Sequence, residues 1–113
     1  MTVYVIVSDA GVRDALVLLL EQLGRDAVAF DDCDAFLSTV RPGPDDTVLV
    51  DLNEDDDANG ARIVRWADAL ENPPRLIAIT SRSRDEIAKL LADLRLPILI
   101  RMPFNASRLM TWL

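Results

Sequence analysis

The chain has 113 residues, a formal net charge of −7 and no histidine, and half of its residues are apolar. This length allows one domain with a buried core, and the longest apolar run, Ala15–Leu20, is too short to span a bilayer. The negative charge argues against nonspecific binding to nucleic acids or anionic membranes, and without histidine the chain has neither imidazole catalysis nor histidine-ligated zinc.

The first half of the chain alternates between predicted strands and helices. Val3–Val7 is a run of apolar, mostly β-branched residues, which predicts a buried strand. Apolar residues from Val12 to Leu23 then recur at the spacing of one helix face, which predicts a helix that ends at Gly24. A second strand, a short helix and a third strand are predicted at Ala27–Phe30, Asp34–Val40 and Thr47–Val50.

The second half continues this alternation. After the acidic run Glu54–Asp57, a helix is predicted from the apolar spacing of Ile63, Val64, Ala67 and Leu70. Ser83 and Glu86 have the spacing of a capping box, which predicts the start of a helix that continues to Leu94. Strands are predicted on either side of that helix, at Leu76–Ile79 and Ile98–Ile100, and Asn105 is placed to cap a short last helix through Leu113.

Five strand–helix units in series predict an α/β fold. We expect a (βα)5, doubly wound, five-stranded parallel sheet with strand order 2-1-3-4-5, as in flavodoxin-like proteins. Residues 1–113 are expected to form one domain, and the short last helix leaves open whether an output domain follows. Cys33 is the single cysteine, which excludes an internal disulfide and fits a reducing cytoplasm.

Polar residues follow the predicted strands at one edge of the sheet. Ser8 and Asp9 come after the first strand, Asp51 after the third, and Thr80 after the fourth. Ligands of open parallel sheets bind beyond the carboxyl ends of the strands. Two carboxylates suit a hard cation such as Mg²⁺, and an Asp beside such a cation can act as a nucleophile toward a phosphoryl group.

With these residues the chain resembles the receiver domains of two-component response regulators over nearly its whole length. Asp51 matches the family's phosphoacceptor, Thr80 matches its switch hydroxyl, and Met102-Pro103-Phe104 matches its Lys-Pro-Phe. Val12–Leu16 and Asp34–Leu37 look most like receivers of nitrogen-fixation-type transcriptional regulators. The resemblance implies a histidine kinase or another signalling protein as the partner.

The resemblance also implies roles for further residues. A weak Mg²⁺ site would use Asp9, Asp51 and Asn53, and Ser81 would contact the phosphoryl group together with Thr80. The peptide bond before Pro103 is expected to be cis, which is uncommon for X-Pro bonds in general. The output surface, through which the domain could also dimerise, would lie on the fourth helix, fifth strand and fifth helix, at Ile87, Leu91, Arg101 and Leu109.

Three residues depart from the family pattern. Ser8 replaces the first acid of a pair, Leu99 stands where many receivers have an aromatic switch residue, and Met102 replaces the Lys that pairs with the phosphoryl oxygens. A charge pair near 4 Å contributes about 4 kcal/mol at an effective dielectric of about 20, so its loss should measurably weaken the interaction with the phosphoryl oxygens. These departures favour a degenerate receiver that acts by protein–protein contact, with weak or absent phosphorylation at Asp51. The alternative is a working phosphoacceptor, able to control a DNA-binding output domain.

The site residues also have plain structural interpretations. Asp9 is equally well placed to cap the first helix, and Thr80 can be an ordinary β-branched strand end. Arg82 and Arg84 could swing in to replace the missing Lys, although such residues are more often solvated. A flavin or nucleotide binder is disfavoured because no glycine-rich loop follows the first strand.

Overall fold

The computed structural model describes residues 2–52, 59–102 and 105–112, and within these ranges five strands alternate with five helices. The strands are β1 (Thr2–Ile6), β2 (Asp26–Phe30), β3 (Thr47–Asp51), β4 (Arg75–Thr80) and β5 (Ile98–Arg101), and the helices are α1 (Ala10–Gln22), α2 (Cys33–Thr39), α3 (Asn59–Asp68), α4 (Arg84–Leu90) and α5 (Ala106–Trp112). All strand pairs are parallel, in the order β2-β1-β3-β4-β5. The predicted fold class and strand order are confirmed.

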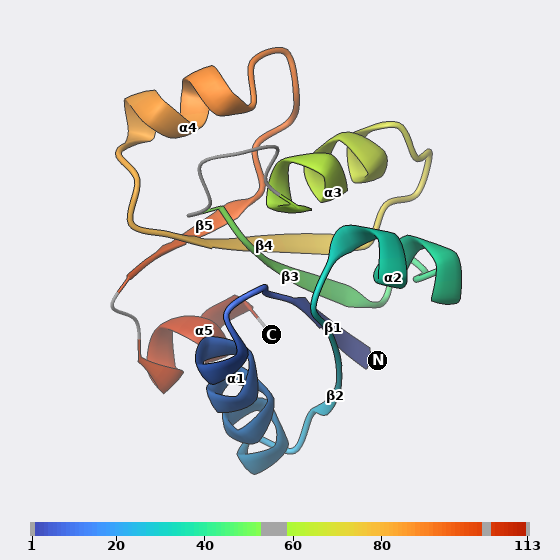
Figure 1. The fold of residues 1–113 in the computed structure, drawn as a ribbon, viewed down its shortest axis with the longest axis vertical. Coiled ribbons are helices and arrows are strands. Elements are labelled where there is room, and N and C mark those ends of the chain that lie inside the picture. The colour runs from blue at the N-terminus through green and yellow to red at the C-terminus, as the bar shows by residue number, and fades with distance from the viewer. Residues whose placement is uncertain (1, 53–58, 103–104, 113) are drawn as a thin grey trace.

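Helices cover both faces of the sheet (Figure 1). α1 and α5 lie below it in this view, and α2, α3 and α4 lie above it. The buried residues accordingly form two clusters. The lower core consists of Val3, Val5, Val7, Leu16, Leu20, Leu49, Ile77, Ile79, Ile100 and Leu109. The upper core consists of Ile6, Cys33, Phe36, Val48, Val50, Leu52, Ala61, Ile63, Val64, Ala78, Ile87 and Leu91.

The central strands are apolar on both sides because both sides are covered. In β3, Val48 and Val50 face the upper core and Leu49 faces the lower core. All three side chains are fully buried. This double burial explains why the strand has a continuous apolar run instead of alternating apolar and polar residues.

The predicted helix ends are largely confirmed. At the end of α1, Gly24 has a φ of 77°, and Arg25 N donates to Leu20 O at 2.9 Å, which is the Schellman arrangement that favours glycine. Ser83 and Glu86 form the predicted capping box, and Asn105 Oδ1 accepts from Arg108 N at 3.0 Å.

The main difference in boundaries is the length of α4. This helix ends at Leu90, whereas the apolar spacing predicted a helix to Leu94. Asp93 has a φ of 68°, in the left-handed region, so helical backbone does not continue through it to Leu94. Leu94 nevertheless packs against the upper core, so the apolar spacing reports burial beyond the end of the helix.

Cys33 packs as a small apolar residue of the upper core, as predicted. Burial raises the pKa of its thiol, which keeps the sulfur protonated and weakly reactive. Among the described residues, no helix is both long enough and apolar enough to cross a bilayer.

Candidate functional site

The carboxyl ends of β1, β3 and β4 meet at one edge of the sheet. β3 lies between the other two strands, and the register pairs Ile6 with Val50 and Asp51 with Ile79. Ser8 and Asp9 come after β1, Thr80 is the last residue of β4, and Ser81 follows it. The topology therefore brings the predicted site residues of these three strands to the same edge, with Asp51 on the central strand.

Asp9 has the structural role that the sequence left open. Its Oδ1 accepts a hydrogen bond from Val12 N at 3.0 Å, so Asp9 is the N-cap of α1. The side chain is exposed to solvent. A carboxylate has two oxygens, and the cap uses Oδ1, so capping is compatible with contact to a cation at the same edge.

Arg13 is a site residue that sequence reasoning missed. Its Nη1 donates to Val7 O at 2.9 Å and to Ser8 O at 3.3 Å, which places a half-buried guanidinium at the end of β1. Arg13 lies one helical turn after the Asp9 cap, which puts its long side chain within reach of the strand end. This spacing could have predicted the contact from the sequence.

The start of α3 packs directly against the end of β3. A Cβ atom on Gly60 would lie 2.4 Å from Asp51 O and 2.6 Å from Leu52 Cδ2. Glycine is therefore required at this position for the helix to approach the half-buried Asp51. The predicted ligand Asn53 and the acidic run Glu54–Asp57 lie outside the described residues.

The segment after β4 is held by hydrogen bonds on several sides. Thr80 is 1% exposed, and its Oγ1 accepts from Arg82 N at 3.0 Å. Arg82 Nε donates to Leu52 O at 2.6 Å, and Arg101 Nη1 donates to Arg82 O. The Arg82 side chain is only 18% exposed. Arg82 is therefore not a solvated surface residue: its guanidinium lies beside the residue that follows Asp51.

Met102 and Leu99 each pack against the core. Met102 is half-buried against the lower core, on the same side of β5 as Ile98 and Ile100, and its N–H donates to Thr80 O at 2.9 Å. Leu99 packs on the opposite side, against the upper core. The Met102 thioether brings no charge to the strand ends. Pro103, predicted to follow a cis bond, lies outside the described residues.

The structure corrects the predicted output surface. Ile87, Leu91 and Leu109 are at most 1% exposed and belong to the core, because they lie on the helix faces that cover the sheet. Of the four predicted residues only Arg101 is exposed. A groove of about 500 Å³ lies between α4, β5 and the end of α5, and its lining includes Arg84, Ala88, Leu96, Leu99 and Trp112.

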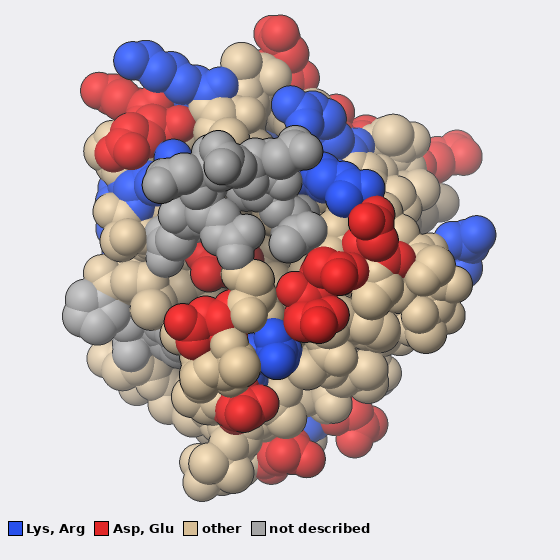
Figure 2. Space-filling view, viewed as in Figure 1, with Lys and Arg blue, Asp and Glu red and all other residues tan. Residues whose placement is uncertain are grey.

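The donor set available for a metal is small. The described residues contain no group of three or more Cys, Asp and Glu side chains placed to hold an ion. The carboxylate oxygens of Asp9 and Asp51 are the kind of donor that a hard cation such as Mg²⁺ prefers, and such an ion keeps several waters. On the face that Figure 2 shows, acidic and basic side chains are interleaved, with no broad basic patch.

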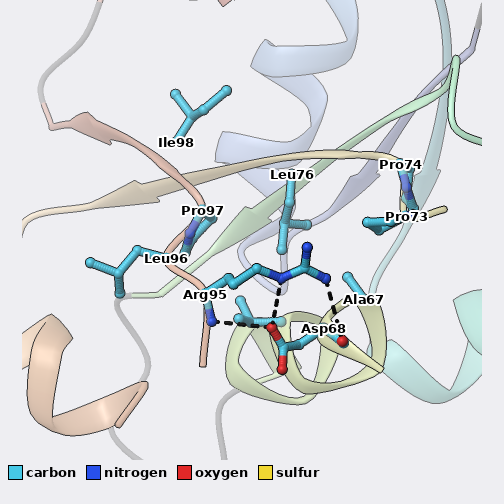
Figure 3. Close-up of a pocket in the computed structure, with 10 residues that line it drawn as sticks. Ala67, Asp68, Pro73, Pro74, Leu76, Arg95, Leu96, Pro97 and Ile98 are labelled. Carbon is cyan, nitrogen blue, oxygen red and sulfur yellow. Dashed lines mark hydrogen bonds and ion pairs between the residues drawn. The ribbon is translucent and has the colours of Figure 1, made fainter. Parts of the chain in front are cut away.

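A second pocket lies at the opposite edge of the sheet (Figure 3). It has a volume of about 240 Å³ and is lined by residues at the amino ends of β4 and β5 and at the end of α3. On its wall, Arg95 donates to Asp68 Oδ1 through its backbone N at 3.1 Å and through its Nε at 3.0 Å. No predicted site residue lines it.

Acid should weaken this Asp68–Arg95 contact. Hydrogen bonding from Arg95 lowers the pKa of Asp68 from its ordinary value. The pair therefore stabilises the fold above the unfolded pKa of about 3.9, and this contribution is lost as the pH falls through the lowered pKa. Urea midpoints measured from about pH 6 to about pH 2.5 should fall less in Asp68→Asn than in the wild type over this acid range. Equal acid slopes in the two proteins would contradict the assignment.

Comparison with known proteins gave matches among solved structures. No family model matches the chain, and no curated protein matches it in sequence. A response regulator receiver protein from Burkholderia phymatum is 24% identical, with a TM-score of 0.72, over 97% of this chain and 89% of that one. Full-length FixJ from B. japonicum is 26% identical, with a TM-score of 0.78, over 97% of this chain and 54% of that one. The BeF3-activated receiver domain of DrrB, a Thermotoga maritima protein, is 21% identical, with a TM-score of 0.77, over 98% of this chain and 93% of that one.

Proposed function

Since the chain has the fold of the receiver domains of response regulators, we propose that it is an atypical receiver in phosphorelay signalling. In this proposal the domain acts through protein–protein contact, and phosphorylation at Asp51 is weak or absent. The observation that carries it is Met102, which packs into the lower core where the resemblance expects a Lys. The role is that of a signalling module rather than an enzyme.

The proposed chemistry at Asp51 is phosphoryl acceptance. A carboxylate oxygen of Asp51 attacks the phosphorus of the donor, and the bond from phosphorus to the donor's leaving atom breaks, with its electron pair leaving on the donor. Asp9 and Asp51 would hold Mg²⁺, which neutralises charge on the phosphoryl oxygens when it is bound. Ser8 has a hydroxyl group at the position where a second carboxylate would bind the cation more strongly. Thr80 and Ser81, at the end of β4, would contact the phosphoryl group.

Labelling by acetyl phosphate tests this proposal. With Mg²⁺ present, the wild type should be labelled slowly and to a low final fraction, because Met102 supplies no positive charge where the resemblance expects a Lys. Intact-protein mass spectrometry, which detects the added phosphoryl group, measures both the rate and the extent.

Two variants control this experiment. Asp51→Asn should remove the labelling, since an amide is not a nucleophile toward phosphorus. Met102→Lys restores the expected cation and should raise the rate by about tenfold or more, given that a close charge pair contributes a few kcal/mol. Fast, complete labelling of the wild type would overturn the proposal.

The second candidate is a working phosphoacceptor that takes its phosphoryl group from a histidine kinase. One observation favours it: Arg82 places a guanidinium beside Leu52, the neighbour of Asp51. In this case trifluoroberyllate with Mg²⁺ should raise the thermal unfolding midpoint of the wild type but not that of Asp51→Asn.

The proposed partner is a histidine kinase or another signalling protein, with no direct contact to nucleic acid or membrane. A homodimer through α4, β5 and α5 is part of the same proposal, with the groove residues Arg84, Ala88 and Trp112 and the exposed Arg101 as its surface. We place the domain in the cytoplasm, consistent with a single buried thiol. Relatedness to nitrogen-fixation-type regulators stays a prediction.

A further inference from the structure

We propose that the pocket at the amino edge of the sheet binds one large apolar side chain from an extended segment of a partner protein. Arg95, on the wall of this pocket, donates a hydrogen bond to a backbone carbonyl beside that side chain. The inference rests on the proposed role of the domain in protein–protein contact. It assigns that contact to the edge of the sheet opposite Asp51.

The first support is the lining and the size of the pocket. Eight of its ten lining residues are apolar, and three of these eight, Pro73, Pro74 and Pro97, have no backbone N–H. The volume of about 240 Å³ is smaller than the roughly 300–1,000 Å³ of sites that enclose a drug-sized ligand. A single large side chain suits this space better, and the side chains that anchor protein interfaces in such pockets are often aromatic.

The second support is a hydrogen-bond donor that is already in place. Arg95 donates to Asp68 Oδ1 through its backbone N at 3.1 Å and through its Nε at 3.0 Å, and its Nη2 donates to Asp68 O at 3.4 Å. In Figure 3 the guanidinium lies between Asp68 and Leu76. Within the described part of the chain, Arg95 Nη1 makes no hydrogen bond or ion pair. Nη1 can therefore donate to a ligand with little further ordering of the arginine.

The ion pair also indicates which kind of acceptor fits. Asp68 already offsets the positive charge of Arg95, and the chain as a whole has a net charge of −7. A second carboxylate beside Arg95 would be repelled by Asp68, whereas the neutral carbonyl of a peptide backbone would not. An apolar side chain next to a neutral carbonyl is the combination that an extended peptide segment presents.

The third support is the position of the pocket next to the groove that we propose as a contact surface. Leu96, Pro97 and Ile98 line both the pocket and the groove. Leu96 is 57% exposed. A partner that lies in the groove can therefore reach the pocket across Leu96 without leaving the surface of the domain.

The test uses nuclear magnetic resonance on the full chain with three small probes. N-acetyl-phenylalaninamide has both the side chain and the carbonyl, toluene is the same side chain without a carbonyl, and N-acetylglycinamide is the backbone without a side chain. N-acetyl-phenylalaninamide should shift the backbone amide signals of Ala67, Asp68, Leu76 and Leu96 in a saturable manner, with a Kd of the order of 1 mM, as expected for so small a ligand. N-acetylglycinamide should leave these signals unchanged at the same concentrations.

Two variants test the role of Arg95. Arg95→Gln removes Nη1 and should weaken binding of N-acetyl-phenylalaninamide by about threefold or more, the effect of one hydrogen bond. It should change the binding of toluene by less than about twofold, because toluene has no acceptor. Arg65→Gln is the matched control, since Arg65 is exposed on the same helix as Asp68 and does not line the pocket. It should leave the affinity for both probes unchanged.

Several results would overturn the inference. The first is the absence of saturable shifts at the pocket with N-acetyl-phenylalaninamide. Equal losses for both probes in Arg95→Gln would mean that Arg95 only supports the structure, and toluene binding as tight as that of N-acetyl-phenylalaninamide would mean that the pocket takes a plain apolar molecule. Shifts of the same signals on dilution of the protein alone would mean that a second copy fills the pocket. Labelling of Asp51 is measured separately, so a failure here and a failure of the proposed function are distinguishable.

Discussion

Replacement of Phe36 by Ala is expected to lower the free energy of unfolding by about 3–5 kcal/mol, the range for large aromatic truncations in cores. Phe36 lies on α2 and is fully buried. Its ring makes edge-on contacts with Tyr4 of β1, Phe30 of β2 and Trp66 of α3, at centroid distances of 5.7, 5.6 and 5.5 Å. One side chain thus joins two strands and two helices.

The expected loss of unfolding free energy is large because Phe36→Ala removes several interactions at once. Removing the ring leaves a cavity in the upper core and deletes three aromatic pairs, each contributing about 0.5–1.5 kcal/mol beyond burial. Domains of this size have a total stability of about 5–15 kcal/mol, so Phe36→Ala is expected to bring the protein close to unfolding at room temperature.

Urea unfolding followed by circular dichroism measures this loss. Leu18→Ala is the matched control, since Leu18 is apolar, sits on α1 and is 58% exposed. It should change the free energy of unfolding by less than about 1 kcal/mol. Similar losses for the two variants would mean that the upper core does not depend on Phe36.

Gly60→Ala is expected to destabilise the protein, by about 1–3 kcal/mol or more, although Ala is the better helix former. The added Cβ would lie 2.4 Å from Asp51 O, a backbone atom that cannot rotate away. Either α3 or the end of β3 must therefore move. Because the strand end carries Asp51, phosphoryl labelling at Asp51 should fall as well.

Gly43→Ala is the control for this substitution. Its added Cβ would meet its nearest neighbour, Asp46 Oδ2, only at 4.0 Å. It should leave the urea midpoint unchanged or slightly raised, because the unfolded chain loses freedom. A midpoint for Gly60→Ala as high as that of Gly43→Ala would show that α3 does not approach Asp51 as closely as the structure has it.

Much of the fold could be predicted from the sequence because its patterns are local. Continuous apolar runs such as Val48–Val50 indicate strands buried on both sides, and apolar residues at helical spacing, such as Leu16 and Leu20, indicate helix faces. Caps are local too, since Ser83 and Glu86 are only three positions apart. Boundaries were less predictable, as the early end of α4 shows.

The position of the candidate residues at one edge of the sheet could also be predicted, because the carboxyl ends of parallel strands meet there. Ser8, Asp9, Asp51 and Thr80 could be assigned to that edge once the strands were recognised. Spacing cannot say which neighbour each side chain contacts. It left open whether Asp9 caps a helix, and it assigned Ile87, Leu91 and Leu109 to a surface when they belong to the core.

The sequence by itself determined the order of strands and helices, the double-sided core and the acidic edge with its uncharged Met102. Those features depend on periodicity and on residue type, which are present in the chain before it folds. Only the tertiary structure decided that Arg82 reaches Leu52 and that Gly60 packs on Asp51. These contacts join residues far apart in sequence, and they form only when β3, β4 and α3 come together around the same edge.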